Sequence, residues 1–305
     1  MHKSVLLNEV LEYLSLKDDS IIVDCTLGYA GHSSCILKEI KKGFLFAFDQ
    51  DDEAIKYSQE KLKEISSNYE IIRSNFVNLK KELNKRNINE VDGILFDLGV
   101  SSPQLDEENR GFSFHKDARL DMRMDQNNKL SAYEVVNNYS YDELVNILYK
   151  YGEEKYASSI VKGIIKYRQN KNIETTLELA EIIKNNVPMK YRNEKHPARK
   201  TFQAIRIEVN NELEVFSSAL NQALDLLKVG GRICVITFHS LEDRICKETF
   251  KKVSSVSEEL KKLPIIPLEY QPKYKVIANI TPNNEELEIN NRSRSSRLRV
   301  IERIR

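Results

Sequence analysis

The chain has 305 residues, of which 41% are apolar and 30% are charged, and its formal net charge is +1. These values are typical of a globular protein with one large or two smaller domains, and they exclude a disordered or fibrous chain. No run of eighteen apolar residues predicts a membrane span, and the near-neutral charge excludes a general basic surface for nucleic acid.

The first hundred residues alternate short apolar runs with amphipathic runs. The apolar runs predict strands that are buried on both faces of a parallel sheet, at residues 20–25, 44–49, 69–74 and 93–99. The amphipathic runs between them predict helices over 32–42, 51–67 and 78–87. This alternation indicates an α/β fold with an open, doubly wound sheet.

The alternation stops after residue 99. Apolar positions at three- and four-residue steps then predict helices over 141–152, 153–169 and 176–186. A helical insertion explains this interval better than one very long loop. A further helix is predicted from residue 201 to a stop at "KVGG" (228–231), and strands are predicted at 231–238, 273–280 and 296–304.

The cysteines and the N-terminal sequence indicate the compartment. Four cysteines are scattered without a C-x-x-C pair, which predicts neither a disulfide framework nor a metal site: Cys25, Cys35, Cys234 and Cys246. The amphipathic N-terminal segment lacks the apolar core of a signal peptide. We therefore expect a reducing, cytoplasmic environment.

The turn "VDCTLGYAGHS" (23–33) follows the first predicted strand and is the first candidate ligand site. It carries Gly28 and Gly31, and Asp24 ends the strand before it. Asp49 follows Gly31 by eighteen residues, close to the spacing at which a carboxylate binds a ribose, and Asp97 ends the fourth strand. This pattern fits NAD and S-adenosylmethionine equally well, and the turn alone could also be an ordinary tight turn.

Asp24 favours S-adenosylmethionine over NAD as the ligand of this turn. A pyrophosphate would be repelled by a carboxylate at the strand end, whereas the sulfonium and ammonium groups of S-adenosylmethionine would be attracted. No G-x-x-x-x-G-K-[ST] motif is present, so an ATP-type loop is not expected. The pattern favours a methyl-donor site, with an NAD-dependent dehydrogenase as the rival.

The segment "FDLGVSSPQLDEENRGFSFHKDARLDMRMD" (96–125) closely resembles the signature of the bacterial 16S rRNA cytosine-N4 methyltransferases, the RsmH or MraW family. Further blocks occur in family order at 2–14, 24–33, 201–214, 230–244 and 291–303. The resemblance implies a class I methyltransferase domain, here 1–115 with 205–305, and an inserted helical domain, 116–204. It also implies methylation of one cytidine amine in the decoding region of the small subunit, with S-adenosylmethionine as cofactor.

The resemblance also implies the donor site. Carried over by motif, its residues are Ala30, Gly31, His32, Asp49, Phe76, Asp97 and Gln104, beside Asp24 and Gly28 of the turn. The family commonly has Gly-Gly-His where this chain has Ala30-Gly31-His32. If the contact there is a backbone N–H, alanine can serve provided that its φ is negative.

The turn after the fourth strand is the candidate catalytic site. A cytosine amine is a poor nucleophile, so its methylation needs acceptors for the amine hydrogens and in-line placement of the methyl group. We expect Asp97 and Ser102 to supply such groups, with Ser101 nearby and Pro103 stiffening the turn. The alternative is that Asp97 only holds the amino group of the donor.

Arginines among aromatic residues suggest where the 16S rRNA or the small subunit could bind. The candidates are Arg110, Arg119, Arg123, Arg199, Arg206 and His239. Each has a structural alternative: a packed loop, a solvated helix side, or a structural histidine with Ser240 as the helix N-cap. Arg297 and Arg299 of the last predicted strand are further candidates for phosphate contact.

Three other functions remain open from the residues alone: the dehydrogenase, an inactive RNA-binding module, and a methyltransferase acting on another RNA base, a protein or a small molecule. A membrane partner is not expected, and a homodimer is conceivable because the inserted helical domain is large enough for association.

Overall fold

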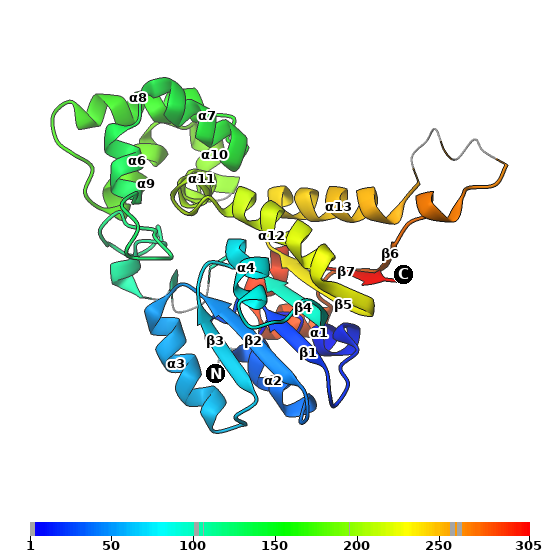
Figure 1. Cartoon of the computed structure of the whole chain (residues 1–305). Coiled ribbons are helices and arrows are strands. Elements are labelled where there is room, and N and C mark those ends of the chain that lie inside the picture. The colour runs from blue at the N-terminus through cyan, green and yellow to red at the C-terminus, as the bar shows by residue number, and fades with distance from the viewer. Residues whose placement is uncertain (1–3, 101–103, 106, 195, 257–259, 261–263) are drawn as a thin grey trace. The chain divides into compact units, whose positions relative to one another are not determined.

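The computed structural model describes residues 4–100, 104–105, 107–194, 196–256, 260 and 264–305 (Figure 1). Contacts divide the chain into two compact units: Met1–Gly99 with Leu213–Arg305, here the sheet unit, and Val100–Glu212, here the helical unit. Relative to the predicted boundaries, residues 100–115 and 205–212 join the helical unit. No helix in the described part of the chain is long and apolar enough to cross a membrane.

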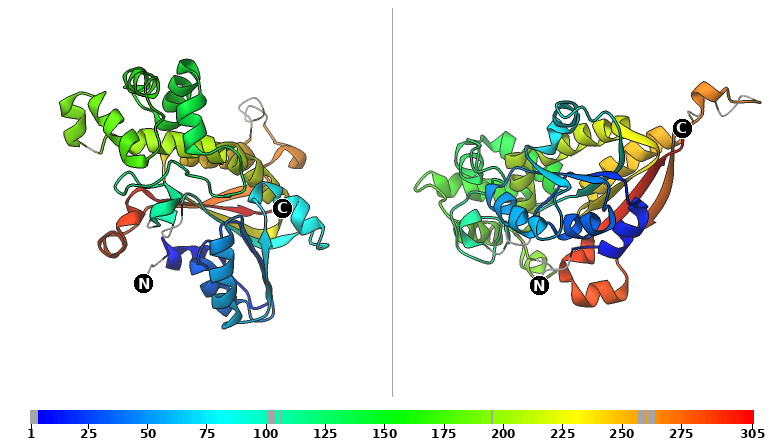
Figure 2. Two further views of the ribbon diagram at one scale, coloured as in Figure 1. Left: turned by 90° about the vertical axis from the view of Figure 1, so that its left-hand side faces the viewer. Right: turned by 60° about the horizontal axis from the view of Figure 1, so that its bottom comes forward.

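The sheet unit contains one seven-stranded sheet in the order β3-β2-β1-β4-β5-β7-β6. Figure 2 shows the chain from two further sides. Its strands are β1 Ile21–Asp24, β2 Phe44–Asp49, β3 Tyr69–Arg73, β4 Val91–Asp97, β5 Leu227–Thr237, β6 Tyr274–Ile280 and β7 Arg297–Arg303. β1 to β5 are parallel, and β7 runs antiparallel to both β5 and β6. The predicted doubly wound α/β class is confirmed.

Both faces of this sheet are covered, which explains the nearly continuous apolar runs. In β2, Phe46 and Phe48 belong to one buried cluster, whereas Leu45 and Ala47 belong to the other, because strand side chains alternate. The helices of this unit are α1 Leu7–Leu14, α2 Gly31–Glu39, α3 Asp52–Lys63, α4 Leu79–Asn84, α12 Glu212–Leu226, α13 Ser240–Ser254 and α14 Asn284–Ile289.

The helical unit has a core of its own. Its helices are α6 Ala132–Asn138, α7 Tyr141–Gly152, α8 Ala157–Arg168, α9 Thr176–Asn185, α10 Met189–Glu194 and α11 Arg199–Asn210. α6, α7 and α9 each begin with a capping box, in which the N-cap hydroxyl and a glutamate three residues later satisfy the free N–H groups. The predicted helical insertion is confirmed.

Two predictions about residues 201–231 are wrong. The expected single helix is two, because Asn211 has a left-handed backbone (φ 49°) that ends α11 before α12 starts. The "KVGG" segment is not a helix stop, because it lies within β5. Gly230 has a φ of 83°, which glycine tolerates inside a strand, and the pairing with β4 is irregular beside it, between Val91 and Gly93.

Candidate active site

The turn after β1 is strongly bent. Gly28 has a φ of 49° and Ala30 a φ of 54°, and α2 begins directly after Ala30. The N–H of Ala30 donates to the carbonyl of Leu27 at 2.8 Å. A backbone contact of Ala30 with S-adenosylmethionine is expected only if the φ of Ala30 is negative. Its positive φ does not meet this condition. An added Cβ at Gly31 would lie 1.9 Å from Oγ of Ser4, so a larger residue there requires the Ser4 side chain to move.

Asp24 is the buried centre of this turn. Its Oδ1 accepts from the N–H of Thr26 at 3.0 Å, and its Oδ2 accepts from the hydroxyl of Ser33 at 2.6 Å. The side chain is 1% exposed. Asp24 thus supplies a buried negative charge at the end of β1, but both of its oxygens already hold the turn together.

Thr26 links two strand ends, a role that the sequence reasoning missed. Its Oγ1 accepts from the N–H of Asp97 at 2.7 Å and donates to Asp24 Oδ1 at 3.3 Å. The ends of β1 and β4 are therefore joined by side chains beyond the ladder. The only sequence signal was a hydroxyl residue two positions after a strand-end aspartate, which is common in turns.

Asp49 lies at the end of β2 and faces the same turn. Its Oδ2 accepts from the N–H of Gly28 at 2.8 Å, and its Oδ1 accepts from the N–H groups of Gln50 and Asp51 at 2.8 and 2.9 Å. Burial raises the pKa of Asp49 to about 6, despite the opposing effect of these three bonds. The carboxylate is held in a fixed orientation, and its remaining lone pairs are suited to hydroxyl groups.

Asp97 and His32 form a pair at the end of β4. His32 Nε2 lies 3.0 Å from the carbonyl oxygen of Val5, and its Nδ1 lies 3.4 Å from Asp97 Oδ2. A carbonyl only accepts, so Nε2 carries a hydrogen. A neutral His32 would then turn a lone pair toward the carboxylate. The pair is attractive only when it holds one further proton, on Nδ1 or on Asp97.

The second carboxylate oxygen of Asp97 can still accept hydrogen bonds. Oδ1 is buried and, within the described residues, has no hydrogen-bond partner. Burial raises the pKa of Asp97 to about 6, and the charges of Asp24 and Glu242 add to this rise while His32 opposes it. A buried acceptor without a partner is uncommon, and such a group is a candidate functional group.

The remaining predicted donor and catalytic residues are placed less completely. Phe76 starts a short 3-10 helix, Phe76–Asn78, and its ring lies edge-on to buried Phe96 with centroids 5.8 Å apart. Gln104 is buried and belongs to the helical unit. Ser102, with Ser101 and Pro103, lies outside the described residues.

Three of the predicted RNA-binding arginines have internal partners. Arg110 is 4% exposed and donates to the carbonyls of Arg123 and Met124. Arg123 makes a double contact with Asp121 and also donates to two loop carbonyls. Arg206 makes a double contact with Glu212, each bond 2.8 Å long. These side chains serve structure, whereas Arg119 and Arg199 are exposed.

His239 and Arg299 also have internal partners. His239, not Ser240 as predicted, is the N-cap of α13, with Glu242 completing the capping box. The N-cap accepts an N–H bond here through an imidazole nitrogen in place of the expected hydroxyl. Arg299 is 9% exposed and binds Asp243 through two bonds of 2.7 and 3.0 Å, which occupies the face expected to meet phosphate.

Comparison with known proteins identifies the family. A sequence profile described as "MraW methylase family" matches residues 1–304. The "Ribosomal RNA small subunit methyltransferase H" of Exiguobacterium sibiricum is 54% identical over 307 residues, which is 100% of this chain and 98% of that protein.

Solved structures also match over the whole length. A putative rRNA methylase from Clostridium thermocellum is 14% identical, with a TM-score of 0.47 and 100% of both chains covered. A putative methyltransferase from Streptococcus mutans in complex with SAH is 14% identical, with a TM-score of 0.44 and 99% of both chains covered. The profile match from residue 1 to residue 304 and the 54% identity to a curated relative show that this chain belongs to the MraW methylase family.

Proposed function

We propose that the chain transfers a methyl group from S-adenosylmethionine to the exocyclic N4 amine of a cytidine in the decoding region of 16S ribosomal RNA. Family membership supplies the reaction class. The structural observation that carries the proposal is the His32–Asp97 pair, which presents a buried carboxylate oxygen without a partner in the described chain at the end of β4. Ligands of open α/β sheets bind at these carboxyl ends.

The donor is assigned to the ends of β1 and β2. Asp49, oriented by three backbone N–H groups, accepts from the ribose hydroxyls. Phe76, fixed by its edge contact with Phe96, offers an apolar wall to the adenine. The buried charges of Asp24 and Asp97 favour the sulfonium and ammonium groups over a phosphate. Gly28 and Gly31 let the backbone approach closely.

Asp97 acts on the target amine in this proposal. Its Oδ1 accepts an N4–H bond, which favours the pyramidal nitrogen that attacks the methyl carbon. The S–CH₃ bond breaks as the N–CH₃ bond forms, and the positive charge moves from sulfur to N4. One N4 proton then passes to the Asp97 carboxylate, whose Oδ2 lies 3.4 Å from Nδ1 of His32. Ser102 remains a predicted second polar group in this step.

The setting of the reaction is part of the same proposal. The helical unit recognises the RNA or the small subunit, through exposed residues such as Arg119 and Arg199. The enzyme works in the cytoplasm, where its four free cysteines stay reduced. Association into a homodimer stays a prediction, and sedimentation of the purified chain tests it.

The decisive experiment incubates the purified protein with labelled S-adenosylmethionine and unmodified small subunits, and in parallel with naked 16S RNA. Nucleoside mass spectrometry should detect N4-methylated cytidine in at least one substrate form. Label on another nucleoside would show that a different base is the target. Label on ribosomal protein alone would show that the substrate is protein and not RNA. Tight binding of NAD without binding of S-adenosylhomocysteine would instead support a dehydrogenase.

A further inference from the structure

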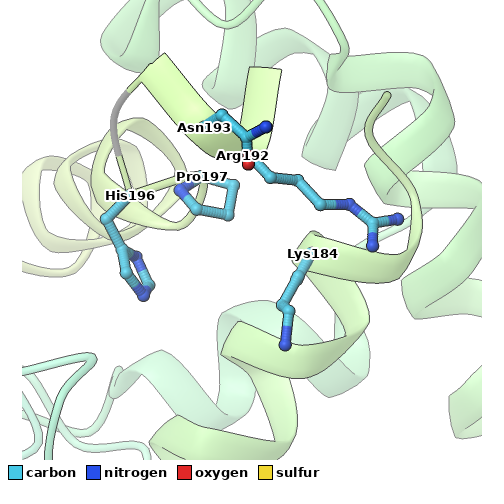
Figure 3. Close-up of a pocket in the computed structure, with 5 residues that line it drawn as sticks. All are labelled: Lys184, Arg192, Asn193, His196 and Pro197. Atoms are coloured by element: carbon cyan, nitrogen blue, oxygen red, sulfur yellow. The ribbon is translucent and has the colours of Figure 1, made fainter. Parts of the chain in front are cut away.

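The helical unit contains a hollow that no predicted site includes. Its volume is about 400 Å³, and it is lined by Lys184, Arg192, Asn193, His196 and Pro197 (Figure 3). Lys184 comes from the last turn of α9, Arg192 from α10, and His196 from the segment before α11. The hollow thus combines two cationic side chains, an imidazole and an amide, and no carboxylate is among its lining residues.

The two cations keep donors available. Arg192 uses Nε to donate to the carbonyl of Val187 at 3.2 Å, its one side-chain bond in the described part of the chain. Its terminal nitrogens therefore keep their hydrogens for a ligand. Lys184 lies 3.3 Å from Glu181, but both side chains are more than half exposed. Such surface pairs contribute little and yield readily to a better partner.

His196 is held in a fixed orientation. Its ring stacks on Phe114 with centroids 4.3 Å apart and an interplanar angle of 17°. Phe114 in turn lies edge-on to Phe202, which is 3% exposed and belongs to the core of the helical unit. A ring anchored in this way loses little freedom when it binds a ligand.

The hydrogen bond of His196 decides which nitrogen can donate. Nδ1 accepts from the N–H of Ala198 at 3.4 Å, so the neutral ring carries its hydrogen on Nε2. Burial lowers the pKa of His196, and the nearby His115 and Lys184 lower it further. A group surrounded by positive charge gains from a bound anion, because the anion relieves the repulsion.

We propose that this hollow binds the phosphate backbone of the RNA, with Arg192 on one side and Lys184 and Nε2–H of His196 on the other contacting neighbouring phosphate groups. Guanidinium, ammonium and imidazole donors around an open hollow match the several acceptor oxygens of a phosphodiester. The choice of RNA over a free anion rests on the proposed function. Stacking against Phe114 fixes the geometry, so the site positions the strand and carries no base specificity.

The first test compares two variants of the full-length enzyme. Lys184→Gln with Arg192→Gln removes both cations, and Lys190→Gln is the matched control, because Lys190 also lies on α10 and is exposed but does not line the hollow. The double variant should raise KM for the RNA about tenfold with kcat unchanged, and should lower the salt dependence of binding by about 0.7 per lost single-strand phosphate contact. The control should match the wild type.

The second test uses inorganic phosphate and follows the imidazole signals by NMR. Phosphate should raise the pKa of His196 in the wild type but not in the double variant, while His239 of the sheet unit serves as the reference. An unshifted His196, or a double variant with wild-type KM and salt dependence, overturns the proposal. A phosphate shift without any effect on RNA also overturns it, in favour of a free-anion site. Because the titration needs no methyl transfer, a wild type that methylates no RNA would overturn the proposed function separately.

Discussion

The two units of this protein use buried charge in opposite ways. In the helical unit, Arg110 and Arg123 are turned inward and their donors are spent on loop carbonyls and on Asp121. In the sheet unit, Asp97 is also turned inward, yet Oδ1 has no partner in the described chain and its pKa is raised to about 6. Charge type and burial therefore do not distinguish a binding residue from a structural one. Unused hydrogen-bonding capacity does.

The largest expected effect is at Asp97. Asp97→Asn removes the charge that accepts the amine proton, and kcat should fall by about 10² to 10³. The matched control is Asp225→Asn, an exposed partner of Lys80, which should keep full activity. Turnover is measured at saturating donor and RNA, and donor affinity by calorimetry. Full turnover with unchanged donor affinity would remove Asp97 from both of its assigned roles.

The next effect concerns stability in the helical unit. Arg123→Gln leaves Asp121 without its double contact and two loop carbonyls without a donor, so the free energy of unfolding should fall by about 2 to 3 kcal/mol. Arg119→Gln changes an exposed arginine of the same segment and should stay within about 0.5 kcal/mol. Urea unfolding measures both. Equal losses of unfolding free energy in the two variants would contradict the difference between the hydrogen-bonded Arg123 and the exposed Arg119.

A smaller effect is expected at Asp49. Asp49→Asn keeps the side-chain shape but loses the charge, so KM for the donor should rise about ten- to thirtyfold while kcat changes little. Asp52→Asn is the control, because Asp52 follows Asp49 closely in the chain but is 65% exposed and pairs with Arg73. A change in kcat without a change in donor affinity would assign Asp49 to the chemical step instead.

Activity and stability should respond to pH with opposite signs. Asp49 and Asp97 must both be ionised for full activity, and burial raises the pKa of each to about 6, so kcat/KM should fall by up to about a hundredfold per pH unit below pH 6. The same raised pKa means that protonation favours the folded state. Their contribution to stability should therefore grow as pH falls from 6 to about 4, the ordinary range of an aspartate.

Unfolding and turnover measured on the same samples separate this behaviour from acid denaturation. In Asp97→Asn, part of the gain in stability between pH 6 and pH 4 should disappear. A parallel loss of folding and activity over that interval would contradict the raised pKa values.

The smallest effect is expected at Ala30. Ala30→Gly relieves a left-handed backbone by about 1 kcal/mol but loses a fully buried methyl group of about 0.8 kcal/mol, so the free energy of unfolding should change by less than about 0.5 kcal/mol. Ala30→Val is the contrasting variant and should cost more than about 2 kcal/mol, because a β-branched side chain does not tolerate this φ. A clear stabilisation by glycine would show that backbone strain dominates the turn.

The strands were predictable because the sheet is buried on both faces, which leaves a strong apolar signal. β2, expected at 44–49, is Phe44–Asp49. Local patterns failed where the backbone depends on context. The glycines of "KVGG" look like a helix stop, but here they accommodate an irregular pairing within β5. No residue in the sequence around Ala30 or Asn211 requires a positive φ at these two positions.

The candidate site was predictable in its residue types but not in their partners. Strand-end aspartates can be read from sequence, since a strand's end and the carboxyl edge of the sheet coincide. The link from Asp97 through Thr26 to Asp24 joins residues far apart in the chain, and no local pattern signals it. The ion pairs of the arginines were equally hidden from local patterns. Arg206 resembles a binding residue in the sequence, and only the structure shows its double contact with Glu212.

The order of the strands has a consequence for synthesis on the ribosome. The helical unit is one continuous segment, Val100–Glu212, so it can fold as soon as it emerges. The sheet must wait, because β4 pairs with β1 on one side and with β5 on the other, and β7, the last strand made, inserts between β5 and β6. Until then the apolar edge of β4 is unpaired, which makes the half-finished sheet the aggregation-prone stage of this chain.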